Sequence, residues 1–251
     1  MKKLLCKNLC QVLAAIVFLV VVWIIAYYAV GNKLLIPPFT ESVKEGWLLL
    51  GEKGFWVGFS HSLLRSIDAF LLSFLFAAIF AVVAYLYPAF KGFLAPIASA
   101  LRSLPVLAVL LILLSFLDAD KAPVAVAFLS LFPMLYISVL TALSSVDRQV
   151  IEVSRVQGTS TWRKITAIYL PLSAPHILKE GAAALSFSVK LVVSAEVLAS
   201  TAKSLGGMMQ EAKVYAEIPQ LFALVVVAFI AGLVLETAVT LLATYAERKI
   251  R

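Results

Sequence analysis

Residues 122–146 read APVAVAFLSLFPMLYISVLTALSSV and contain no charged side chain. A helix needs about 20 predominantly apolar residues to cross the hydrocarbon core of a bilayer. Lipid offers no water to the backbone amides, so a single-segment crossing of this kind is an α-helix, in which those amides bond internally. The stretch therefore predicts one membrane-spanning helix.

The composition of the whole chain agrees with this prediction. The 251 residues are 63% hydrophobic and 14% charged, and the mean hydropathy is +1.02. Ordinary soluble domains are about 45–50% apolar and about 25% charged. The difference excludes an ordinary soluble enzyme and a disordered chain. Long unbroken apolar runs also exclude a membrane β-barrel, whose strands alternate apolar and polar residues.

Five more apolar runs predict spans of the same kind, at 11–31, 69–90, 93–117, 181–200 and 218–245. We therefore expect an all-α integral membrane protein of about six transmembrane helices. It would form a single domain over 1–251, with a first span at 11–31 and a core bundle at 58–250. With six spans, twelve of the loop and terminal Lys and Arg residues lie on the side of the termini and six on the other. Because basic residues collect in cytoplasmic loops, both termini are predicted to be cytoplasmic.

The predicted cytoplasmic loop, residues 147–180, carries most of the functional information. Residues 152–171 read EVSRVQGTSTWRKITAIYLP. This pattern favours two short amphipathic helices joined at Gly158, with the second helix ended by Leu170-Pro171. A projecting element that mixes apolar and charged residues is typical of a docking site for another protein.

The spacing in this loop resembles the EAA loop of the permease subunits of ABC importers. That family has Glu-Ala-Ala, three residues, Gly, nine residues and Ile-x-Leu-Pro. Glu152, Gly158 and Ile168-x-Leu170-Pro171 fit it without a gap, and Val153 and Ser154 replace the alanines. Further motifs are similar to the branch that handles sulfonates, taurine, nitrate and thiamine-precursor pyrimidines: Ser62-Leu63-Leu64-Arg65, Leu101-Arg102-Ser103-Leu104-Pro105, Ala195-Glu196 and Leu205-Gly206-Gly207.

The resemblance implies a type I ABC importer permease fold in the cytoplasmic membrane of a bacterium or archaeon. A second copy of this chain, or a close partner, would complete the pore, and an extracytoplasmic binding protein would deliver the solute. Two cytoplasmic ATPase subunits, which hold ATP and Mg²⁺, would dock on the loop. This chain has no P-loop, so we do not expect it to hydrolyse ATP itself. We also expect no catalytic residue, metal or cofactor in it, and no nucleic-acid partner. The expected coupling residues are Glu152, Val153, Ser154, Gly158, Trp162, Ile168, Leu170 and Pro171.

Ionisable groups inside spans are costly in lipid and usually line a bundle interior or a water path. Arg65, Arg102, Lys190 and Glu196 are therefore the candidate translocation-pathway residues, although mutual ion pairing or snorkelling would also explain them. If the solute is anionic, Arg102 and Lys190 would attract it. Gly206-Gly207 predicts a tight external turn. A stand-alone secondary transporter or channel is the alternative function, but it gives no account of the loop spacing.

Overall fold

The computed structural model describes residues 2–146, 163 and 165–250, and within them every regular element is helical. The elements are α1 (Lys2–Val30), α2 (Phe39–Leu49), α3 (Lys53–Leu86), α4 (Pro88–Ser103), α5 (Val106–Leu114), α6 (Ala122–Ser144), the π-helical turn η1 (Ile165–Tyr169), α9 (Leu170–Ala199), α10 (Leu205–Val214) and α11 (Ile218–Ile250).

Four of these segments are long and apolar enough to cross a membrane: Lys53–Leu86, Ala122–Ser144, Ile165–Ala199 and Ile218–Tyr245. The pair α4 and α5 is also long and apolar enough to cross a membrane when the two helices are taken together. Helix α1 contributes a shorter apolar helix, Ala14–Val30. The prediction of an all-α membrane protein with about six spans is confirmed.

The third predicted span is not one straight helix. The sequence predicts a continuous helix over 93–117, but α4 and α5 meet at an angle of 90° across Leu104-Pro105. Proline disfavours the helical conformation of the residue before it, and Leu104 accordingly takes an extended conformation with ψ 131°. That part of the prediction is wrong because the apolar length of a segment does not report a local break.

Helix α9 is the centre of the bundle. It contacts α3, α6, α10 and α11, and 61% of its most apolar window is buried, against 22% for α11. Helix α3 offers α6 a stripe of small buried side chains, which allows the two helices to approach closely. The stripe consists of Ala69, Ser73, Ala77, Ala81 and Ala84.

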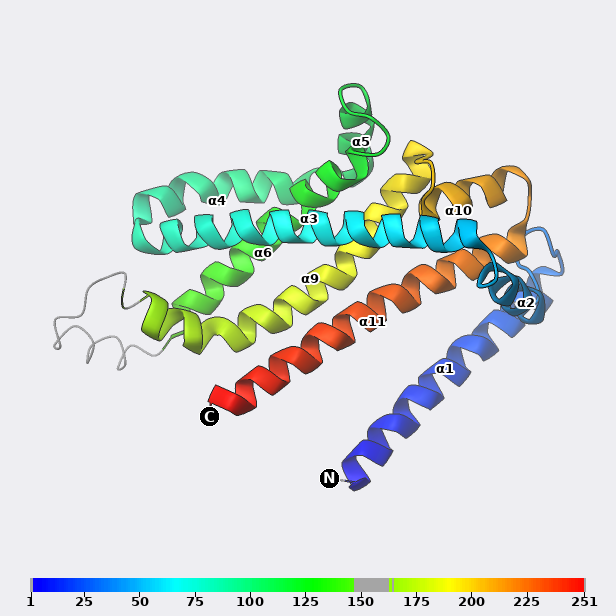
Figure 1. Cartoon of the computed structure of the whole chain (residues 1–251), viewed down its shortest axis with the longest axis horizontal. Helices are drawn as coiled ribbons and strands as arrows, with labels where there is room; N and C mark the ends of the chain where they lie inside the picture. The colour runs from blue at the N-terminus through cyan, green and yellow to red at the C-terminus, as the bar shows by residue number, and fades with distance from the viewer. Residues whose placement is uncertain (1, 147–162, 164, 251) are drawn as a thin grey trace.

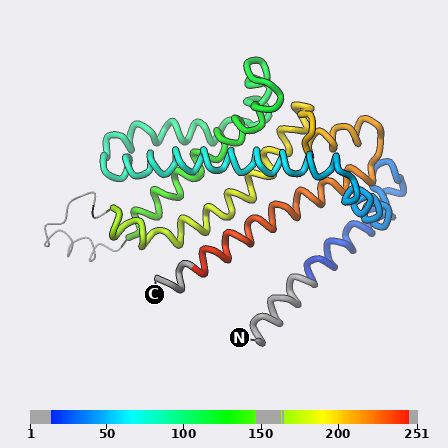
Figure 2. Tube along the Cα trace, viewed as in Figure 1, coloured from blue at the N-terminus to red at the C-terminus, as the bar shows by residue number. Residues whose placement is uncertain are grey.

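The two ends of the bundle differ. Figure 1 and Figure 2 show the α3–α4 turn and the beginning of α9 at one end, and α2 and α10 at the other. Helix α1 reaches the bundle through Trp23, whose ring packs against Phe39 of α2 and Phe222 of α11 with centroids 5.5 and 5.2 Å apart.

Candidate functional site

The structure describes the last part of the predicted coupling motif. Ile168, Leu170 and Pro171 fall within the described residues, and Ile168 is half-buried while Leu170 is 41% exposed. The other predicted coupling residues lie outside the described residues: Glu152, Val153, Ser154, Gly158 and Trp162.

The described part of this motif is anchored in the main core. Ile165 and Tyr169 of η1 are both buried there, and the Tyr169 ring meets the edge of the Tyr85 ring of α3 with centroids 5.0 Å apart. The Ser173 hydroxyl donates to the Tyr169 carbonyl at 2.6 Å. The buried side chains and the Tyr85 contact therefore fix the turn to the bundle, and the Ser173 bond joins it to the start of α9.

The expectation that Leu170-Pro171 ends a helix is wrong. The chain passes from η1 directly into α9, and Pro171 lies in the first turn of that helix. Proline is tolerated there because its position does not need an N–H to continue the helix. The last part of the predicted loop, 170–180, is accordingly the beginning of α9.

Two of the predicted pathway residues meet at the far end of α9. The Glu196 carboxylate is fully buried. It accepts a hydrogen bond from the Ser62 hydroxyl at 2.6 Å and from the Arg65 guanidinium at 3.0 Å. The Gly206 backbone N–H of α10 donates to the same carboxylate at 3.3 Å. One side chain of α9 thus joins α3 and α10.

Arg65 extends this network to the connection between α5 and α6. Its second guanidinium nitrogen lies 2.8 Å from the Asp120 carboxylate, and Arg65 is 15% exposed while Asp120 is 66% exposed. The Thr201 hydroxyl donates to the Ala119 carbonyl at 2.7 Å, beside the same connection. The arrangement matches the ion-pairing interpretation of Arg65 and Glu196, because each charge already has a partner.

Gly206 and Gly207 lie in the first turn of α10, so the predicted tight turn is wrong. A Cβ on Gly206 would overlap the Glu196 Cβ and the α9 backbone at Val193 and Val197. The Gly207 N–H donates to the Ser204 hydroxyl, which caps the helix, at 2.8 Å. Glycine is required here because α10 approaches α9 so closely.

The other two predicted pathway residues lie elsewhere. Lys190 is exposed on α9, on a different face from Glu196. Arg102, in the last turn of α4, lines a cavity of about 330 Å³. The four candidates therefore do not converge: Arg65 and Glu196 form one pair, and Arg102 and Lys190 are separate. Sequence reasoning missed Asp120 as a partner of Arg65, since nothing local links residues 55 positions apart.

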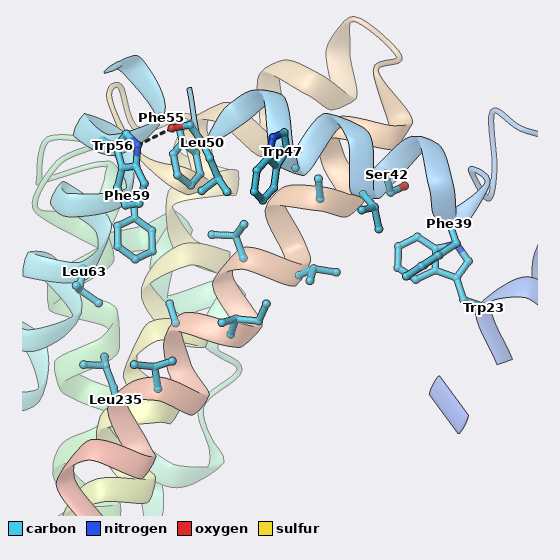
Figure 3. A pocket seen from close by; sticks show the side chains of 18 residues that line it. Trp23, Phe39, Ser42, Trp47, Leu50, Phe55, Trp56, Phe59, Leu63 and Leu235 are labelled. Carbon is cyan, nitrogen blue, oxygen red and sulfur yellow. Dashed lines mark hydrogen bonds between the residues drawn. The ribbon is translucent and has the colours of Figure 1, made fainter. Parts of the chain in front are cut away.

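A second cavity, of about 530 Å³, lies between α2, α3 and α11 (Figure 3). Aromatic and aliphatic side chains line it, among them Trp47, Phe55 and Phe59, and Ser42 supplies a hydroxyl. The Trp56 indole N–H donates to the Leu50 carbonyl at its rim at 2.9 Å (Figure 3). A cavity without charged groups does not suit a charged solute.

Comparison with known proteins finds relatives that match most of the chain. A family model described as binding-protein-dependent transport system inner membrane component matches residues 73–251. The taurine transport system permease protein TauC of Escherichia coli (strain K12) is 28% identical over 202 residues, which cover 78% of this chain and 73% of that protein. The putative aliphatic sulfonates transport permease protein SsuC of Bacillus subtilis (strain 168) is 29% identical over 160 residues, covering 63% of this chain and 56% of that protein.

The fold has solved counterparts as well. A crystal structure of an amino acid ABC transporter superposes with a TM-score of 0.67 at 16% sequence identity, and the match covers 82% of this chain and 98% of that one. At this identity the likeness concerns the fold alone.

Proposed function

Since this chain belongs to the binding-protein-dependent transport system inner membrane component family, we propose that ATPase subunits drive it through its 147–180 loop. It is the transmembrane permease subunit of an ABC importer. Its relatives are transport permeases and not enzymes. Family membership disfavours the alternative of a stand-alone transporter or channel.

The observation that carries the coupling proposal is the continuity of α9. This one helix runs from Leu170, at the end of the predicted docking motif, to Ala199, close to the Glu196 network. At 1.5 Å per residue, its 30 residues span about 45 Å. Although Pro175 lies inside it, the helix is continuous, and a continuous helix of that length transmits a displacement of one end to the other, where Glu196 holds α3 and α10. Closure of the ATPases around bound ATP and Mg²⁺ would thus reach the opposite end of the bundle.

The assembly that we propose contains two ATPase subunits, a second copy of this chain and an extracytoplasmic binding protein in a cytoplasmic membrane, with both termini cytoplasmic. Two features of the chain support a partner within the membrane. Lys190 is exposed about two thirds of the way along α9, where a charge facing lipid would be costly. Helix α1 contacts the rest of the chain mainly through α2, and most of its side chains between residues 14 and 30 are exposed and open to a neighbour.

The proposed solute is small and carries an anionic group. The relatives named for taurine and for aliphatic sulfonates support this. In the proposed pathway, Arg102 and Lys190 would attract the anion because neither takes part in an ion pair within the described part of the chain. Arg65 and Glu196 would instead stabilise the wall of the pathway, because they form an ion pair with each other.

The test combines co-purification with uptake. Affinity purification of the tagged chain from its native membrane should recover an ATPase subunit, and the solitary-carrier alternative predicts none. Glu152→Lys or Gly158→Trp should abolish solute-stimulated ATPase activity and uptake, with the chain still inserted at its normal level. Glu211→Lys is the matched charge reversal, because this exposed residue belongs to α10, and it should leave both activities within about twofold. Normal coupled uptake by both loop variants would refute the docking assignment.

A further inference from the structure

The cavity at Arg102 is lined by opposite charges from two helices and by hydroxyl groups from a third. Arg102 comes from α4, and His176 and Glu180 come from α9. Helix α6 supplies the hydroxyls of Ser138 and Thr141, and the Ser138 hydroxyl is closed off from solvent without a hydrogen-bond partner among the described residues. Of the residues the structure describes, neither Arg102 nor Glu180 has an ion-pair partner.

These charges belong to segments that are long and apolar enough to lie at membrane depth. Glu180 is near the middle of the segment Ile165–Ala199, and Arg102 lies next to the 90° bend between α4 and α5. A charged side chain at such depth meets a water-filled cavity or another polar group rather than lipid. Arg102 and His176 are exposed, whereas Glu180 is half-buried. The cavity therefore presents an accessible positive group and a negative group to the same space.

The pairing of charges selects the class of solute. A simple anion drawn to Arg102 would be repelled by Glu180. A simple cation drawn to Glu180 would be repelled by Arg102. A molecule that carries both charges satisfies both side chains, while hydroxyls from α6 can hydrogen-bond its polar groups. The volume of about 330 Å³ lies at the lower end of the roughly 300–1,000 Å³ of small-molecule pockets.

We propose that this cavity is a transit site for a small zwitterion, with the anionic group at Arg102 and the ammonium group at Glu180. The proposal rests on the proposed transport function and narrows its solute class. The proposal adds four residues to the pathway besides Arg102: His176, Glu180, Ser138 and Thr141.

Thiol labelling tests the site in the assembled transporter in membranes. The background is a Cys6→Ser, Cys10→Ser chain, which contains no other cysteine. Thr141→Cys in that background should react with the anionic reagent 2-sulfonatoethyl methanethiosulfonate and with its cationic trimethylammonium counterpart, as read by intact mass, because Thr141 is exposed and lines the cavity. Ser73→Cys is the matched control, because Ser73 is fully buried between α3 and α6 and should stay unlabelled. His176→Cys, at another exposed lining residue, reports on the α9 side of the cavity if Thr141→Cys does not fold.

The charge variants distinguish the two halves of the site. Neighbouring charges in a cleft raise the local concentration of a counter-ion by about tenfold or more. Arg102→Gln should therefore slow anionic labelling about tenfold without slowing cationic labelling, and Glu180→Gln should do the opposite. Millimolar taurine, a zwitterion, should protect the thiol more than isethionate, in which a hydroxyl replaces the ammonium group.

Three outcomes would overturn the proposal. They are labelling as slow as at Ser73, labelling rates that neither charge variant changes, and protection by taurine no greater than by isethionate. Labelling needs only the folded chain in its membrane. A failure of the transport function would appear separately, as absence of a co-purifying ATPase.

Discussion

Replacing Glu196 by leucine is the most direct test of the network that joins α3, α9 and α10. The substitution removes the acceptor of three hydrogen bonds, from Ser62, Arg65 and Gly206. Removing one partner of a buried ion pair costs about 3–5 kcal/mol, because the other charge is left uncompensated. Arg65 keeps Asp120, but that carboxylate is 66% exposed, and an exposed pair contributes about 0–1 kcal/mol. We therefore expect a loss of about 3 kcal/mol in the free energy of unfolding.

A double-mutant cycle with Arg65→Met separates the pair from the packing around it. Arg65→Met alone leaves Glu196 buried with only Ser62 and Gly206 as donors, so we expect a loss of about 2–4 kcal/mol. The double variant buries no unpaired charge and should lose clearly less than the sum. The expected coupling is about 2 kcal/mol or more, whereas uncoupled sites add to within about 0.5 kcal/mol.

The assay is unfolding of the purified chain in mixed micelles by increasing SDS, followed by tryptophan fluorescence. Glu211→Leu, at an exposed position of α10, controls for the loss of a surface carboxylate and should change stability by less than about 0.5 kcal/mol. Additive single and double variants would show that Arg65 and Glu196 do not act as a pair, and the reasoning from their geometry would be refuted.

Three contacts in the bundle give further predictions, each measured by the same unfolding assay. Gly206→Ala should destabilise the folded chain by about 2–3 kcal/mol, because the new methyl group meets the α9 backbone. Gly92→Ala is the control: it lies in open space on α4 and should stabilise the chain by about 0.5–1 kcal/mol. Equal effects of the two substitutions would contradict the close packing of α10 on α9. Tyr136→Phe should be neutral or stabilising by up to about 1 kcal/mol, since the buried hydroxyl has no partner among the described residues, and a loss above that would reveal a missing partner. Thr201→Val should cost about 1 kcal/mol through the lost bond to the Ala119 carbonyl, and an unchanged midpoint would show that this bond contributes nothing.

Several features of the site could be foreseen in part. Arg65 and Glu196 stand out as charges within apolar runs, because such charges are rare and need a partner or water. Their mutual pairing could not be read from the sequence, since they are 131 residues apart. Gly206-Gly207 signals a special backbone position, but a turn and a close helix contact require the same residue type. Only the structure distinguishes the two.

The sequence by itself determined the number and approximate position of the spans, because the apolar length of a segment is a local property that the bilayer thickness translates directly into a helix. It also contains the spacing that marks the family. The tertiary structure alone decided the 90° size of the bend that Pro105 favours locally, the direct passage from Ile165–Tyr169 into α9, and the neighbours of each charge. The physical reason is that a helix apolar on nearly every side has no preferred rotation of its own. Packing against the other helices sets that rotation, and with it the partner that each polar side chain meets.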